Sequence, residues 1–120
     1  MPLVDWISLV AQFRGREASA LKVSATVLRT QGEAPARLRE LAEKHDFAAL
    51  AMLAHSLKGM GGNLMAARIF ELGRDLDEAA RHGDALAIAL AEQLAQAMEM
   101  VLQELGERLA ASQTDSSDHA

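Results

Sequence analysis

The chain has 120 residues and a formal net charge of −5 at pH 7; 50% of its residues are hydrophobic, 3% are aromatic and none is cysteine. This length suits one domain with one core, and the lack of cysteine excludes disulfides and thiol chemistry. The acidic balance, without a basic patch interleaved with aromatic residues, argues against nucleic-acid binding. No apolar run reaches about 18 residues and no secretory signal opens the sequence, so we expect no membrane insertion and a cytoplasmic location.

Apolar residues recur at helical spacing along most of the chain. The pattern predicts helices over residues 3–13, 16–30, 36–44, 46–62, 64–81 and 85–109. Pro35 disfavours a helical conformation of the residue before it and predicts an interruption there, with one long kinked helix as the alternative. Short connections between helices of this length predict an all-α fold: an antiparallel up-and-down four-helix bundle with an additional short N-terminal helix.

Small and polar residues mark the expected helix ends. Asp46 and Asn63 are placed to cap the helices that follow them, and Gly83 suits the left-handed position after a helix. Trp6 is expected in the core. The inner stripe of the second helix is expected to hold Leu21, Ala25 and Leu28, flanked by Val23 and Val27. Residues 1–110 should form the bundle domain, and the polar residues 111–120 a disordered tail.

His55 falls on the solvent side of a helical wheel drawn for the segment after Asp46. The core side of that wheel holds Leu50, Leu53, Ala54, Leu57, Met60, Gly61 and Leu64. The residues one and two turns from His55 on its own side are small, namely Ala48, Ala51, Gly59 and Gly62. A helical glycine costs about 1 kcal/mol relative to alanine. Gly61 lies on the core side, where it lets another helix approach, but Gly59 and Gly62 predict that something outside comes near the imidazole.

The chemistry predicted for this side of the helix is nucleophilic. A neutral imidazole is available near neutral pH, and histidine is a recognised nucleophile that forms covalent intermediates. Lys58 lies one turn after His55 and can offset negative charge that arrives on the ring. The small or apolar residues around it predict a partner-docking surface, made of Ala48, Ala51, Met52 and Gly62.

Two other interpretations of His55 were open. A lone histidine on a helix surface is often only a surface residue, and the wheel alone does not decide between this and a site. Metal binding needs about three protein ligands, and neither a histidine nor a carboxylate stands one turn away on the same side. The other histidines are His45, His82 and His119. This ligand arithmetic predicts no metal site.

The run Ala-His-Ser-Leu-Lys-Gly at residues 54–59 resembles the phosphoacceptor signature of histidine-containing phosphotransfer (HPt) domains of two-component phosphorelays. Further matches lie at residues 46–50, 62–64, 66, 76–80 and 83–84, so the resemblance covers about residues 3–109. It implies an HPt bundle in which His55 accepts a phosphoryl group from the aspartyl phosphate of a receiver domain and passes it to another receiver. It also implies charge compensation by Lys58 and steric access through Gly59.

The resemblance further implies a phosphocarrier without autokinase activity and without a cofactor of its own, because the partner receiver would bring the magnesium ion. The expected partners are receiver domains of response regulators or hybrid sensor kinases, and the domain is expected to be a monomer. Two residues depart from the pattern: Met65 stands where glycine is usual, and Met60 where a small residue is usual. The alternative function is a non-catalytic helical module that binds a receiver or another protein without phosphotransfer.

Overall fold

The computed structural model describes residues 1–118. Its elements are α1 (Trp6–Gln12), α2 (Glu17–Gln31), α3 (Ala34–Glu43), α4 (Phe47–Asn63), α5 (Ala67–Arg81) and α6 (Leu86–Asp118). Within residues 1–118 there is no strand, so the predicted all-α class is confirmed. In the same range, no helix combines the length and hydropathy that a bilayer span requires.

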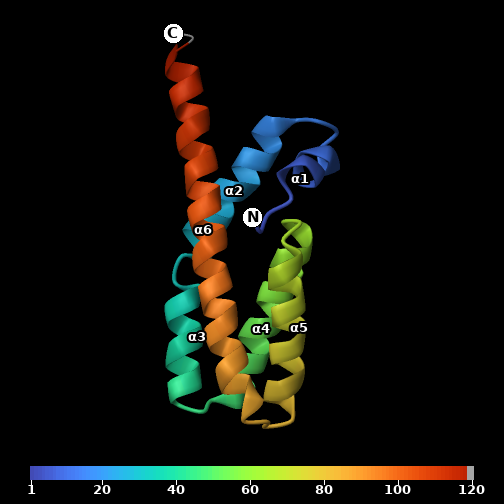
Figure 1. Cartoon of the computed structure of the whole chain (residues 1–120), viewed down its shortest axis with the longest axis vertical. Helices are drawn as coiled ribbons and strands as arrows, with labels where there is room; N and C mark the ends of the chain where they lie inside the picture. The colour runs from blue at the N-terminus through green and yellow to red at the C-terminus, as the bar shows by residue number, and fades with distance from the viewer. Residues whose placement is uncertain (119–120) are drawn as a thin grey trace.

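The longest helix, α6, runs the whole length of an elongated molecule of 54 × 24 × 23 Å (Figure 1). The helices α2 and α3 follow one another along α6, and α4 and α5 form an antiparallel pair beside it (Figure 1). The contacts between α4 and α5 are the most extensive in the fold, and α1 packs on α2. The α4–α5 pair therefore provides the firmest scaffold for a surface site.

An aliphatic core lies between these helices. Its fully buried side chains include Leu50 and Leu57 of α4, Ile69 and Leu76 of α5, and Leu94, Met98, Val101 and Leu105 of α6. Burial of such a side chain stabilises a fold by about 1.5–3 kcal/mol. The core side predicted for α4 is confirmed, with Leu53 and Met60 packed against the core at its partly exposed edge.

The buried side of α2 differs from the predicted one. Leu21 and Leu28 are only half-buried and Ala25 is exposed. The residues that α2 buries are Ala20, Ser24 and Val27. A serine is tolerated there because its hydroxyl donates a 2.8 Å hydrogen bond to the carbonyl oxygen of Ala20, which removes the cost of burying a polar group. The buried side of α2 is therefore shifted by one residue from the side that its aliphatic residues predict.

Several predicted helix ends are confirmed. Asp46 caps α4, since its carboxylate accepts a 3.1 Å hydrogen bond from the backbone N–H of Ala49. Pro35 lies in the first turn of α3, where its missing N–H costs nothing, so the interruption between α2 and α3 is confirmed. Gly83 follows α5 with a φ of 62°, a conformation that glycine adopts readily.

The turn from α4 into α5 is different from the prediction. Asn63 is the last residue of α4, and Ala66 occupies the N-cap of α5, so the predicted cap by Asn63 is wrong. Met65 has a φ of 58°, in the left-handed region that residues other than glycine rarely adopt. The turn is fastened to the N-terminal segment, because the Met65 carbonyl accepts a 2.9 Å hydrogen bond from the N–H of Asp5.

The N-terminal segment is fastened to α6 as well. Trp6 is half-buried at the edge of the core and not inside it as predicted, and the guanidinium carbon of Arg108 lies 4.7 Å from the centre of its ring. The carboxylate of Glu104 accepts hydrogen bonds from the backbone N–H groups of Leu3 and Val4. The start of the chain is therefore held against α6 by Glu104 and Arg108.

The last helix extends beyond its predicted end at Leu109. It continues to Asp118 and so includes residues 111–118 of the segment predicted as a polar tail, while residues 119–120 lie outside the described residues. The sequence accounts for the first part of the extension, because no proline or glycine stands after Gly106 and Ala110, Ala111 and Gln113 favour helix.

Arg39 joins α3 to α6 through two carboxylates. Its Nε lies 2.9 Å from Glu92 Oε2, and its Nη2 lies 2.8 Å from Glu99 Oε1. Hydrogen bonds from Arg39 lower the pKa of both glutamates from their ordinary value. A carboxylate whose pKa is lowered by folding stabilises the protein above its unfolded pKa, and this contribution is lost as the pH falls through the folded value.

We therefore expect Arg39→Met to lower the free energy of unfolding at neutral pH. The difference from the unaltered protein should shrink as the pH falls below 4.5, the ordinary pKa of glutamate. Denaturant unfolding at neutral pH and at about pH 3 measures both quantities. Arg37→Met is the control, since Arg37 pairs with the exposed Glu40 of its own helix and should change stability little. A difference that is the same at both pH values would contradict the interpretation.

Candidate functional site

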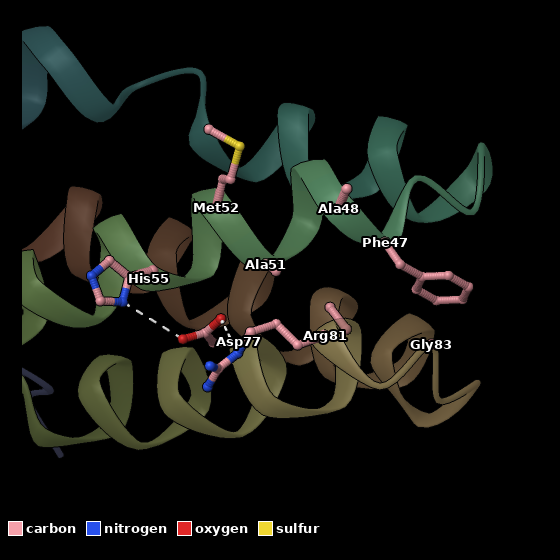
Figure 2. Close-up of a pocket in the computed structure, with 9 residues that line it drawn as sticks. Phe47, Ala48, Ala51, Met52, His55, Asp77, Arg81 and Gly83 are labelled. Atoms are coloured by element: carbon pink, nitrogen blue, oxygen red, sulfur yellow. Dashed lines mark ion pairs between the residues drawn. The ribbon is translucent and has the colours of Figure 1, made fainter.

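His55 lies in the middle of α4 with 72% of its side chain exposed, so the outward orientation expected from the wheel is confirmed. Its ring extends over the line where α4 meets α5 (Figure 2). The helix presents it rigidly, because Ala54 and Leu57, on either side of it in the chain, are fully buried. The imidazole is therefore a fixed and accessible group on the best-packed pair of helices.

A buried carboxylate from α5 stands behind the imidazole. Asp77 Oδ2 lies 3.6 Å from His55 Nδ1, although only 9% of the Asp77 side chain is exposed. Its other oxygen, Oδ1, lies 3.2 Å from Nε of Arg81 (Figure 2). The contact with His55 is somewhat longer than a hydrogen bond, and it is an ion pair only when the ring is protonated. A carboxylate at this place favours the tautomer with its proton on Nδ1, which leaves the lone pair of Nε2 facing solvent.

Asp77 is the residue that sequence reasoning missed. The wheel of α4 contains no carboxylate beside His55, and the run that holds Asp77 reads as a solvated helix face. One signal was available in the sequence. Ile69, Gly73 and Asp77 follow one another at intervals of four residues, so they form one row along the same side of α5. Ile69 and Gly73 are both buried, so a charged residue next in that row needs a partner.

A groove of about 800 Å³ borders His55 on the side toward the start of α4. It is lined by Phe47, Ala48, Ala51 and Met52 of α4, by Asp77, Ala80 and Arg81 of α5, and by Gly83. Three of the predicted docking residues are thus brought together beside the imidazole (Figure 2). Ala51 is buried and forms the floor of the groove, while Met52 is 76% exposed and stands at its rim.

A second hollow of about 550 Å³ borders His55 on the opposite side, between α2 and α4. Val23, Thr26 and Thr30 of α2 and Gly59 of α4 are among the residues that line it. A methyl group at Gly59 would meet no atom within 4 Å, so the space beside this residue is open. Gly62, the fourth predicted docking residue, is exposed two turns away and is covered in part by the ring of Phe70.

Lys58 is half-buried one turn from His55. Among residues 1–118 it makes no ion pair or side-chain hydrogen bond, whereas Arg74 pairs with Asp75 and Arg81 with Asp77. Its charge is therefore not neutralised by a bonded partner. This is the condition that charge compensation of an incoming anion requires.

The other histidines do not join this site. The ring of His82 hydrogen-bonds through Nδ1 to the carbonyl of Glu78, at the end of α5, and His45 stacks edge-on against Phe47. His119 lies outside the described residues. Within residues 1–118 no three histidine or carboxylate side chains are close enough to hold a metal ion.

No protein-family model, no curated protein and no solved structure matches the chain. A functional conclusion must therefore rest on what the site can do chemically. It offers a nucleophilic nitrogen in an open position, a carboxylate that stabilises positive charge on the other ring nitrogen, and an ammonium group one helical turn away.

The carboxylate of Asp77 can be tested through the imidazole tautomer. In Asp77→Asn, Arg81 still requires an oxygen, so the amide nitrogen of the new side chain should face Nδ1 and donate to it. The ring proton should then move to Nε2. Nitrogen NMR of labelled histidine, recorded above the ordinary histidine pKa of about 6.5, measures this change. Asp75→Asn, two residues earlier in the chain at a position that pairs with Arg74, should leave the tautomer as it was; the same tautomer in both variants would contradict the assignment.

Proposed function

We propose that this protein is a histidine phosphotransfer intermediate of the HPt class in a two-component phosphorelay. The observation that carries the proposal is the pairing of an exposed imidazole on α4 with a buried carboxylate on its Nδ1 side, at 3.6 Å. This pairing supports Nε2 of His55 as the phosphoacceptor atom. The motif at residues 54–59 supports the same conclusion independently.

In the transfer, the lone pair of Nε2 attacks the phosphorus of a receiver's aspartyl phosphate. An N–P bond forms, the bond between phosphorus and the aspartate oxygen breaks, and the receiver's carboxylate leaves as an anion. Nδ1 keeps its proton, so the ring gains a positive charge that Asp77 stabilises. Lys58 offsets the charge of the phosphoryl oxygens, and the reverse of the same step passes the group to a second receiver. Magnesium is expected to come with the receiver.

The helix arrangement supports an HPt-type bundle. In this proposal α2 and α3 together form one leg of a four-helix bundle, with α4, α5 and α6 as the others and α1 as the additional short N-terminal helix. The observed contacts of α4 with α5, of α3 and α5 with α6, and of α2 with α6 fit that assignment. Residues 1–110 would be the domain, and the end of α6 extends from it.

The partner would be a receiver domain of a response regulator or hybrid sensor kinase. It would cover the apolar groove beside His55 and approach over Gly59, where the surface is open. The protein would act as a phosphocarrier without autokinase activity, as a monomer in the cytoplasm. The groove by itself also supports the second candidate, a module that binds a receiver or another protein without phosphotransfer, and the first experiment separates the two.

His55→Gln should abolish phosphoryl transfer without disturbing the fold, because the side chain is mostly exposed. Incubation with each phosphorylated receiver of the source organism should place an acid-labile phosphoryl group on the unaltered protein and none on this variant. His82→Gln removes another exposed histidine and should transfer normally. Labelling that persists in His55→Gln, or no labelling from any receiver, would contradict phosphotransfer; binding that survives in both proteins would then favour the interaction module.

Gly59→Glu should slow transfer by about tenfold or more, because it fills the open space beside the imidazole and brings a like charge to the phosphoryl group. Helicity by circular dichroism should be unchanged, since glutamate favours helix over glycine. Gly106→Glu is the matched control: Gly106 also has no neighbour within 4 Å of an added methyl group, and it lies on α6, which lines neither hollow beside His55. Equal transfer rates in the two variants would contradict the access role of Gly59.

A further inference from the structure

We propose that Gly73 is a positioning residue that sets the spacing between α4 and α5 and so keeps Asp77 within reach of His55. Its effect on phosphotransfer rests on the proposed function, but its effect on the imidazole does not. Gly73 is buried on α5 one helical turn before Asp77, and it faces α4 at Lys58, which lies one turn after His55.

The contact at Gly73 is between backbones. A Cβ atom added to Gly73 would lie 3.0 Å from each of three Lys58 atoms, namely N, Cα and Cβ. Carbon atoms in ordinary contact are about 3.5–4.0 Å apart. None of the three atoms is at the end of a flexible side chain, so neither residue can relieve the contact by changing a rotamer. Any residue larger than glycine therefore pushes the two helices apart at this level by a few tenths of an ångström.

The contact between the imidazole and the carboxylate is sensitive to this separation of the helices. His55 Nδ1 and Asp77 Oδ2 are already 3.6 Å apart, somewhat beyond hydrogen-bond distance. Asp77 is held on its other side by Arg81 on the same helix, so its carboxylate moves with α5. Separation of the helices would weaken the preference for a proton on Nδ1, because the energy of that contact falls as the distance grows.

A second close approach lies further along the same pair of helices. A Cβ atom on Gly61 would lie 2.8 Å from Cγ2 of Ile69 and 2.8 Å from the backbone nitrogen of Phe70. Ile69 precedes Asp77 by two turns, whereas Gly73 precedes it by one. The two glycines are therefore separable: both set the packing of α4 on α5, but Gly73 does so at the level of the histidine.

The test is nitrogen NMR of labelled histidine in the unaltered protein and in three variants, above the ordinary histidine pKa of about 6.5. The unaltered protein should carry its His55 proton on Nδ1, and Gly73→Ala should shift the population toward Nε2. Adding Asp77→Glu to Gly73→Ala should restore the original tautomer, because glutamate is one methylene longer and spans the wider gap. Gly61→Ala should lower the melting temperature at least as much without changing the tautomer.

Transfer rates follow the same order if the proposed function is correct. Gly73→Ala should slow phosphorylation of His55 by a phosphorylated receiver about tenfold, and the double variant should recover most of that loss.

The inference is overturned by a proton on Nε2 in the unaltered protein, whether or not the variants fold. It is also overturned by an unchanged tautomer in Gly73→Ala, by failure of Asp77→Glu to restore it, or by an equal shift in Gly61→Ala. The expected tautomers without any phosphotransfer would uphold the positioning role and reject only the proposed function.

Discussion

The close packing of α4 against α5 is the constraint on which the rest of the site depends. His55 comes from one of these helices and Asp77 from the other, so their contact exists only at the separation that the two backbones allow. That separation is set by buried glycines, since a side chain at Gly61 or Gly73 would collide with the opposite helix. The glycines that look costly as helix formers thus have different uses: one inside α4 and one inside α5 permit approach, while Gly59 leaves the surface open.

The buried carboxylate shows how packing and electrostatics are joined. Burial of an unpaired Asp77 would be expensive, and Arg81 at 3.2 Å supplies the charge that makes its position tolerable. Arg81 engages Oδ1 only, which leaves Oδ2 directed to the imidazole. The imidazole of His55 therefore lies beside a carboxylate that solvent scarcely reaches, although the ring itself is open to solvent. The exposed imidazole thus belongs to α4, and the buried carboxylate beside it belongs to α5.

The sequence predicts features that depend on one helix better than features that depend on two. The outward position of His55, the cap by Asp46 and the core side of α4 all follow from the order of residues along a single helix. Asp77 was missed because a wheel of α4 holds no information about which side of α5 lies against it. The shifted stripe of α2 has a similar cause, since the bond that makes Ser24 acceptable in the core is formed by its backbone environment and not by its hydropathy. Met65 stands where the HPt pattern usually has glycine. Its left-handed φ of 58° shows that the chain makes this turn with methionine at that position.

The buried carboxylate also helps to distinguish a docking surface from a nucleophilic site. A docking surface needs shape and apolar area, which the groove lined by Ala48, Ala51 and Met52 already offers. It gains nothing from a carboxylate placed behind the histidine and held there by an arginine. A nucleophile does gain from it, because attack through Nε2 makes the ring cationic and the cation forms beside a fixed negative charge. Under the proposed function, a partner would bring the phosphoryl group and the groups that activate it, and it would cover the hollows on either side of His55.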